Sequence, residues 1–208
     1  MKYRVLIADD RALALQRMST LVKQSGFCEL AGAASSGEEA LRLSRELQPD
    51  LVILDASLGC GMSGLRTAEK LKALLPRVKI VIVTSLPEVS FIERAKAVGA
   101  ESFWYKEQAE APLICVLKRT LAGERVYPSA PPTVALGNIL STELTKTELA
   151  VLRLMTTGAT NMEIARAMSI EETTVKKHIT NMLKKTGYRN RVELAVNARV
   201  AGLVIGEG

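Results

Sequence analysis

Short apolar runs alternate with amphipathic stretches along residues 1–121 of the chain. The apolar runs are rich in Val, Ile and Leu, as expected for strands that are buried on both faces of a parallel sheet. The stretches between them repeat apolar residues every three or four positions, which predicts helices. The predicted strands are Tyr3–Ala8, Cys28–Ala34, Leu51–Leu54, Lys79–Val83 and Ser102–Tyr105, and the predicted helices are 11–25, 37–47, 64–74, 88–98 and 109–121.

This alternation predicts an α/β domain at residues 1–122, built from βα units with right-handed crossovers. We expect a compact (βα)₅ unit with a doubly wound parallel sheet. Ser36 and Glu39 have the spacing of a capping box at the second helix. In doubly wound sheets ligands bind at the carboxyl ends of the strands, so a functional site is expected there.

A second pattern follows a break in periodicity. Residues 123–140 contain three prolines among small residues and show neither helical nor strand periodicity, which predicts a linker. Residues 141–208 predict an all-α domain of four short helices. Capping-box patterns at 145–148 and 160–163 mark the starts of its first two helices. The predicted helices are 146–157, 161–168, 172–186 and 191–202.

Composition narrows the class of protein only slightly. A net charge of +6 suits a polyanionic partner but does not distinguish nucleic acid from an ordinary basic surface. No apolar run reaches the roughly 18 residues of a membrane span, and Met1 leads into a strand rather than a secretory signal, so we expect a cytoplasmic protein without membrane contact. Cys28, Cys60 and Cys115 lack metal-ligand spacing and are expected to be buried, reduced thiols.

Acidic residues stand at the ends of the predicted strands. Asp9 and Asp10 end the first strand, Asp55 the third, Thr84 the fourth and Lys106 the fifth. Because these ends meet at one edge of the sheet, three carboxylates come together, and a hard cation such as Mg²⁺ relieves their repulsion. Asp55 can then attack a phosphoryl donor, while Lys106 neutralises charge and Thr84 donates a hydrogen bond.

Each of these residues also has an ordinary structural interpretation. A single aspartate at a strand end is more often a helix cap or a turn residue. A threonine there is more often a β-former, and a lysine is more often a solvated charge. The occurrence of all these residues at the matching strand ends favours a phosphoryl site over the separate interpretations.

At these positions the sequence resembles the receiver domain of response regulators. The resemblance covers about residues 1–121 and implies a flavodoxin-like (βα)₅ fold whose parallel strands take the order 2-1-3-4-5. It implies that Asp55 accepts phosphate from a sensor histidine kinase and that Thr84 and Phe103 move together on activation. It also implies that Mg²⁺ is held by Asp9, Asp10, Asp55 and the backbone carbonyl of Ser57. The matching residues are Asp9-Asp10, Asp55, Thr84, Gly99-Ala100, Phe103 and Lys106.

Three departures from the receiver pattern lie around this site. The loop 58–64 lacks the family's Met-Pro and is one residue longer, Ser85 stands where the family favours Ala, and Arg11 directly follows the acid pair. The altered loop keeps open an alternative, a transcription regulator that does not depend on phosphorylation and whose receiver serves mainly in dimerisation.

The helix predicted at 172–186 separates apolar from polar side chains. One face carries Val175, Ile179, Met182 and Leu183. Such a helix can pack its apolar side on supporting helices and present cations and hydroxyls to the major groove of DNA. Taken by itself, the polar, lysine-rich face of this helix is more simply interpreted as a solvent-exposed surface. The opposite face carries Lys176, Lys177, Thr180, Asn181 and Lys184.

Residues 144–202 resemble, without gaps, the LuxR-type helix-turn-helix domain of NarL-like regulators. The resemblance implies base contacts from Lys176, Lys177 and Thr180. It also implies DNA phosphates near Lys184, Lys185 and Arg191, and dimerisation through the last helix. The candidate dimer contacts are Val192, Ala195, Val196 and Arg199.

Together these features predict a phosphorylation-controlled transcription regulator of a two-component system. Its expected partners are double-stranded promoter DNA, a sensor histidine kinase and a second copy of the chain. A phosphatase or phosphotransferase using the acidic pocket as an active site is disfavoured, because the sequence offers no second catalytic base and residues 144–202 resemble a DNA-binding domain. We therefore expect that the protein is not an enzyme.

Overall fold

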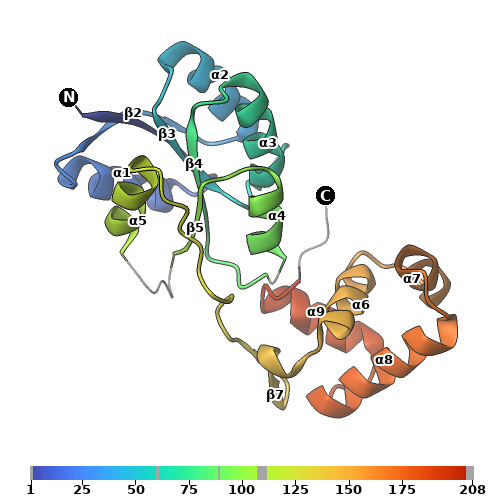
Figure 1. The fold of residues 1–208 in the computed structure, drawn as a ribbon. Helices are drawn as coiled ribbons and strands as arrows, with labels where there is room; N and C mark the ends of the chain where they lie inside the picture. Colours follow the sequence, from blue (N-terminus) through green and yellow to red (C-terminus); the bar gives the residue numbers. More distant parts are fainter. Residues whose placement is uncertain (1, 60, 89, 107–111, 205–208) are drawn as a thin grey trace. The chain divides into compact units, whose positions relative to one another are not determined.

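The computed structural model describes residues 2–59, 61–88, 90–106 and 112–204, and the chain forms two compact units (Figure 1). The N-terminal unit comprises residues 1–85 and 90–130, and the C-terminal unit comprises 86–89 and 131–208. In the part of the chain that is described, no helix is long and apolar enough to span a membrane.

The N-terminal unit is built on a five-stranded parallel sheet with the order β2-β1-β3-β4-β5. This topology confirms the predicted flavodoxin-like fold. The strands are β1 (Tyr3–Ala8), β2 (Cys28–Ala34), β3 (Leu51–Asp55), β4 (Lys79–Thr84) and β5 (Ser102–Tyr105). The helices are α1 (Ala12–Gln24), α2 (Gly37–Leu47), α3 (Gly64–Leu74), α4 (Phe91–Ala97) and α5 (Leu113–Leu121).

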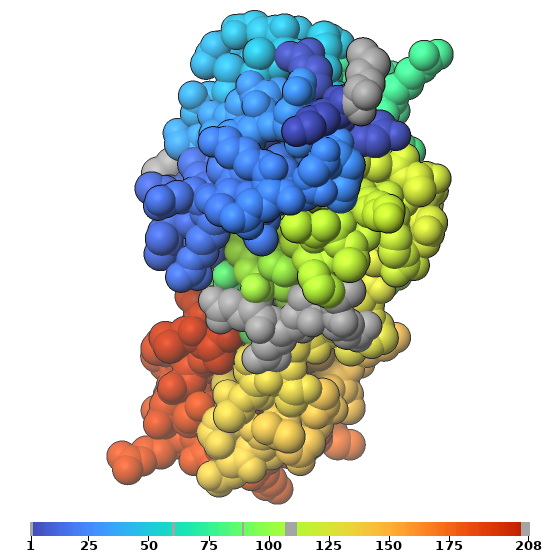
Figure 2. Space-filling view, turned by 90° about the vertical axis from the view of Figure 1, so that its left-hand side faces the viewer, coloured from blue at the N-terminus to red at the C-terminus, as the bar shows by residue number. Residues whose placement is uncertain are grey.

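Helices cover both faces of this sheet. On one face α1 and α5 lie side by side, as Figures 1 and 2 show, and Val22 and Leu117 pack there against Ile53 of β3. On the other face lie α2, α3 and α4 (Figure 1). Every residue of β3 is buried, which explains why its sequence is an apolar run without alternation.

The boundaries of a few elements differ from the prediction. Both β3 and β4 extend one residue further, to Asp55 and Thr84, and α4 begins at Phe91 instead of 88. The predicted first residues of the fifth helix, 109–111, lie outside the described residues. These differences leave the order of elements unchanged.

Two local expectations need correction. The Ser36 side chain accepts the Glu39 N–H at 3.2 Å, but the Glu39 carboxylate accepts the N–H of Ser35 at 2.8 Å, so the capping box is displaced by one residue. Cys28 is buried, as expected, but Cys115 is exposed because it lies on the outer side of α5. Cys60 lies outside the described residues.

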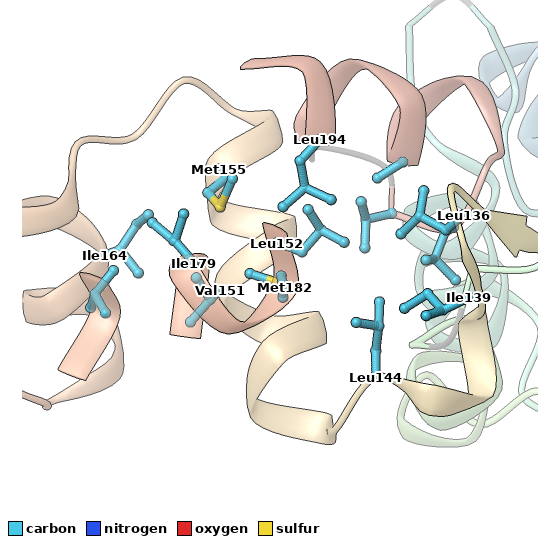
Figure 3. Packing of buried hydrophobic residues seen from close by; sticks show 14 of the residues in the cluster. Leu136, Ile139, Leu144, Val151, Leu152, Met155, Ile164, Ile179, Met182 and Leu194 are labelled. Atoms are coloured by element: carbon cyan, nitrogen blue, oxygen red, sulfur yellow. The ribbon is translucent and has the colours of Figure 1, made fainter. Parts of the chain in front are cut away.

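The C-terminal unit is helical around one apolar core (Figure 3). The capping boxes of Thr145 with Glu148 and of Thr160 with Glu163 are confirmed. Val151 and Leu152 of the first helix and Ile179 and Met182 of the third meet in the core. The helices are α6 (Lys146–Thr156), α7 (Asn161–Met168), α8 (Glu172–Thr186) and α9 (Arg191–Val200).

The predicted linker contains structure that its sequence pattern did not indicate. A hairpin of β6 (Ala135–Leu136) and β7 (Ile139–Leu140) contributes Leu136 and Ile139 to the core of the C-terminal unit. The N–H of Asn138 donates to the Thr186 carbonyl at 2.9 Å, so the hairpin caps the end of α8. Strands of two residues are too short to show a period, but Gly137-Asn138 between apolar residues is a hairpin-turn signal.

Candidate functional site

Two aspartates and a lysine meet at the carboxyl ends of the strands in the N-terminal unit. Asp9 directly follows β1 and is fully buried, and Asp55 ends β3 with 4% of its surface exposed. The ammonium of Lys106, which follows β5, donates to one carboxylate oxygen of each aspartate. The lysine therefore pairs with two buried carboxylates at once.

Backbone hydrogen bonds set the positions of these side chains. The N–H of Ala56 donates to the Val83 carbonyl at 2.8 Å, and the N–H of Lys106 donates to the Thr84 carbonyl at 2.8 Å, which extends the ladders beyond the strand ends. Thr84 itself is buried at the end of β4. The sheet thus fixes Asp55, Thr84 and Lys106 relative to one another.

Burial raises the pKa of the Asp55 carboxyl above its ordinary value. The charge and hydrogen bond of Lys106 and the N–H of Ser57, which donates at 2.7 Å, lower this pKa again, and the Asp9 charge raises it. Lys106 is thus the principal partner that opposes the effect of burial on the Asp55 pKa.

Asp10 points to a different partner. It is exposed, and its carboxylate accepts the N–H of Gly59 at 2.9 Å. Among the residues that the structure describes, no three acidic, histidine or cysteine side chains are arranged to hold a metal ion. The structure therefore brings Asp9 and Asp55 together and leaves Asp10 bound to the loop after β3.

The same loop passes very close to the backbone of Asp55. A Cβ atom at Gly64 would lie 1.7 Å from the Asp55 carbonyl oxygen, and the Gly64 N–H donates to the Ala56 carbonyl at 3.2 Å. Only glycine fits such an approach. The longer loop therefore still returns its glycine to the end of β3.

Phe103 lies in β5 on the buried side of the sheet. It is 1% exposed, and its ring meets that of Tyr105 edge to face with 5.0 Å between centroids. Its N–H donates to the Val126 carbonyl at 2.8 Å, so residues after α5 run along the edge of β5.

In the C-terminal unit, α8 divides as its sequence predicts. Val175, Ile179 and Met182 are buried and Leu183 packs against the same core. The polar face is exposed and carries Lys176, Lys177, Thr180, Asn181 and Lys184. Lys176 pairs with Glu172 one turn earlier at 2.8 Å, and both side chains are exposed. Within the described residues, Lys177 and Lys184 have no ion-pair partner.

Two other basic residues predicted near DNA make contacts inside the unit. The Lys185 ammonium donates to the buried carboxylate of Glu148 at 2.8 Å and to the Glu143 carbonyl at 3.1 Å. The Arg191 guanidinium donates to the Asn161 side chain at 2.9 Å and to the Ala159 carbonyl at 2.7 Å. Both residues therefore connect helices of the unit.

Helix α9 exposes an apolar stripe. Val192, Val196 and Val200 are spaced one turn apart and are 66%, 55% and 82% exposed. Arg199 is exposed beside them, whereas Ala195 is half-buried and packs on the core. Leu194 supplies the buried side of the helix.

Both units match models of known families. The response regulator receiver domain matches residues 5–118, more than half of the chain, and the luxR family of bacterial regulatory proteins matches residues 142–198. The chain belongs to the NarL/LuxR family of response regulators. The N-terminal unit is its receiver domain and the C-terminal unit its LuxR-type DNA-binding domain. This is the composition of a phosphorylation-controlled transcription regulator.

Relatives of full length support this assignment. The response regulator is 34% identical over 205 residues to the nitrate/nitrite response regulator protein NarL of Escherichia coli strain K12, covering 92% of this chain and 93% of that protein. It is 29% identical over 204 residues to the response regulator protein VraR of Staphylococcus aureus strain NCTC 8325, covering 95% and 97%.

A solved structure shares the fold of both domains. The structure of two RcsB dimers bound to two parallel DNAs has a TM-score of 0.65 at 18% identity, covering 96% of this response regulator and 98% of that chain. A two-component response regulator of the LuxR family from Aurantimonas sp. SI85-9A1 has a TM-score of 0.57 at 25% identity, covering 61% and 89%.

Sequence reasoning missed the residue that seats the response regulator's Lys185. Glu148 was predicted only as a capping residue, yet it is 3% exposed and binds both Thr145 and Lys185. A glutamate in a capping box carries no signal for a second partner 37 residues away, because that contact depends on how α6 packs on α8.

Proposed function

We propose that this response regulator accepts a phosphoryl group on Asp55 from a sensor histidine kinase and binds promoter DNA through its LuxR-type domain. The observation that supports the proposal is the buried Asp55 carboxylate at the end of β3, joined to Asp9 by the Lys106 ammonium. An Asp55 oxygen forms a bond to phosphorus as the donor's bond to that phosphorus breaks. Lys106 then balances part of the added charge. The phosphate goes onto the chain's own aspartate, so we propose a regulator rather than an enzyme.

Magnesium fits the donor chemistry of the site. The proposed ligands are Asp9, Asp10, Asp55 and the Ser57 carbonyl, an all-oxygen set of the kind that Mg²⁺ prefers. To join this set, Asp10 must exchange its bond with Gly59, and Lys106 must release part of its hold on the other carboxylates. When bound, the ion would supply positive charge against the transferred phosphoryl group.

The exposed side of α8 supports a role in reading the major groove. We propose that Lys176, Lys177 and Thr180 reach base edges and that Lys184 lies at a DNA phosphate. Lys185 and Arg191 are proposed at phosphates too. An ammonium has three N–H donors and a guanidinium five, so each can keep its internal contacts and still donate to a phosphate oxygen.

We propose that α9 joins two copies of the chain on DNA. Three valines exposed one turn apart form an apolar stripe on an otherwise polar surface, and burying them against the same stripe of a second copy removes it from water. Val192, Val196 and the adjacent Arg199 and Ala195 are the proposed contacts, with Val200 extending the stripe.

The alternative is DNA binding that does not respond to phosphate. One observation favours it. The Lys106 ammonium already donates to both buried carboxylates, so the cation that would pair with a phosphoryl group is engaged in the absence of one. In this case the receiver serves mainly to bring two copies together.

Phosphorylation of the purified protein separates the two proposals. With acetyl phosphate and Mg²⁺, the wild-type protein should incorporate phosphate that alkali and hydroxylamine release, and it should bind its promoter about tenfold more tightly, the effect of about 1.4 kcal/mol of coupling. Asp55→Asn should abolish incorporation, whereas Asp50→Asn, which changes an aspartate outside the site, should not. Label retained in Asp55→Asn would mean that the acceptor is misassigned. Label without any change in DNA affinity would favour the alternative.

A further inference from the structure

Arg11 makes a contact across the phosphoryl site. Its guanidinium Nη2 donates to the Ser85 hydroxyl at 3.0 Å, so the side chain reaches from the start of α1 to the residue after β4. Its Nε lies 3.9 Å from the Asp9 carboxylate, and its backbone N–H donates to the same oxygen at 2.9 Å. The side chain is 56% exposed. Arg11 is therefore anchored at its backbone, and its exposed guanidinium is held by one hydrogen bond to Ser85 and a longer ion pair with Asp9.

A cavity adjoins this contact. It has a volume of about 250 Å³, and its lining includes Arg11, Ser85 and Lys106 together with Trp104 and Arg17. Lys106, which binds Asp9 and Asp55, forms part of the lining, so the cavity reaches the edge of the phosphoryl site at this lysine.

The charge balance of the site changes when Asp55 is phosphorylated. A carboxylate with one negative charge becomes a phosphoryl group with nearly two, and Lys106 is then shared between that group and Asp9. Among the described residues, Arg11 is the other cation within ion-pair distance of this cluster. A guanidinium can donate two parallel hydrogen bonds to phosphate oxygens, which is a better match than the single hydroxyl of Ser85.

We propose that Arg11 leaves Ser85 and pairs with the phosphoryl group on Asp55, and that this contact prolongs the life of the phosphorylated protein. The proposal rests on the proposed function, in which Asp55 is the acceptor. Before Asp55 is phosphorylated, the hydrogen bond to Ser85 holds the guanidinium near the site.

The step that Arg11 slows is hydrolysis. The oxygen of water forms a bond to phosphorus while the bond between phosphorus and the Asp55 oxygen breaks. The electron pair of that bond stays on the carboxylate, and a proton of the water goes to the released phosphate. A guanidinium paired with the phosphoryl oxygens occupies the cavity side and excludes water from it.

The test is the decay of label in the full-length protein. The wild type, Arg11→Ala, Arg11→Lys and Arg17→Ala are labelled with radioactive acetyl phosphate and Mg²⁺, the donor is removed, and the remaining label is followed with time. Arg11→Ala should shorten the half-life about two- to fivefold, the effect of a partly exposed charge pair. Arg11→Lys should lie between, because it restores the charge but not the two-bond geometry. Arg17 lines the same cavity without an ion pair to the acids, so Arg17→Ala should leave the half-life unchanged.

Ser85→Ala distinguishes the effect of the Arg11 charge from the effect of the hydrogen bond between Arg11 and Ser85. This substitution removes the hydrogen bond from Arg11 to residue 85 and keeps the guanidinium. The half-life of the phosphorylated protein should therefore stay the same or lengthen. Trp104 is the chain's one tryptophan and lines the cavity, so its fluorescence should change on phosphorylation in the wild type and change less in Arg11→Ala.

The outcomes separate this inference from the proposed function. If the label on Arg11→Ala decays with a half-life equal to or longer than that of the wild type, the proposed role of Arg11 is wrong, whereas the proposed function is unaffected. If Arg17→Ala shortens the half-life as much as Arg11→Ala does, the effect comes from the net charge of the protein and not from Arg11. If Ser85→Ala shortens it as much, the effect comes from the hydrogen bond between Arg11 and Ser85. Absence of label in the wild type would overturn the proposed function and this inference together.

Discussion

The two candidate sites of this response regulator hold their side chains in opposite ways. At the receiver site, Asp9 and Asp55 are buried and fixed by strand ends and by Lys106, so their chemistry depends on the surrounding backbone. On α8, Lys177 and Lys184 are exposed, and only the seating of the helix on its core sets their direction. A small backbone change should therefore disable the first site, whereas the second should respond to changes in individual side chains or in the packing beneath it.

The largest effect is expected from Gly64→Ala. The added methyl would lie 1.7 Å from the Asp55 carbonyl oxygen, and because that atom belongs to the backbone, the end of β3 must shift. We expect a loss of about 2 to 3 kcal/mol in the free energy of unfolding and at least a tenfold slower phosphorylation. Urea unfolding and the initial rate of labelling measure these two effects.

Gly32→Ala is the matched control for this prediction. Its new methyl would meet the side-chain ends of Leu47 and Leu6, at 2.8 and 3.2 Å, which can turn away. Labelling should proceed at the wild-type rate. If Gly64→Ala is also labelled at the wild-type rate, then labelling does not depend on the backbone position of the loop. The receiver site would then not be as sensitive to small backbone changes as we expect.

Much of the receiver domain could be predicted because its sheet is buried on both faces. The bounds of β1, β2 and β5 agree residue for residue with the apolar runs, since these runs end where polar residues begin. The same pattern placed Asp55 and Lys106 at one edge. It could not predict that Asp10 turns to Gly59, because that bond depends on the path of a loop without periodicity.

The DNA-binding domain shows the same limit in another form. The helical period of α8 predicted its buried and exposed faces, and capping residues predicted where α6 and α7 begin. The hairpin before α6 was missed because its strands have two residues each. The internal contacts of Lys185 and Arg191 were missed because they join helices whose packing a single-helix pattern does not contain.

A smaller effect on stability is expected from Glu148→Gln. Burial alone would raise the pKa of Glu148, but hydrogen bonds from Lys185 and Thr145 outweigh it and lower this pKa below its ordinary value. The charged form therefore stabilises the fold at neutral pH, and this contribution is lost as the pH falls below about 4.3 through the lowered pKa. We expect Glu148→Gln to cost about 1 to 2 kcal/mol at pH 7, and less at acid pH, in urea unfolding of the full chain.

The exposed pair of Glu172 with Lys176 provides the comparison. Both side chains are largely in water, so Glu172→Gln should change the free energy of unfolding by less than about 0.5 kcal/mol. Equal costs for Glu148→Gln and Glu172→Gln would show that burial of the carboxylate does not matter. A cost for Glu148→Gln that grows at acid pH would contradict the direction of the pKa shift.

The smallest effect, and the sharpest test of the exposed site, is expected from Lys177→Ala. The side chain is exposed and has no ion-pair partner within the described residues, so the free energy of unfolding should not change. Loss of one base contact should reduce discrimination between the promoter and a mismatched site by about 1 kcal/mol, measured as the ratio of the two dissociation constants. Lys184→Ala should instead weaken binding to both DNAs alike and reduce the salt dependence by about one counterion, because a phosphate contact carries no sequence information. If Lys177→Ala weakens both DNAs equally, it too lies at a phosphate, and base reading belongs to other residues on the same face of α8.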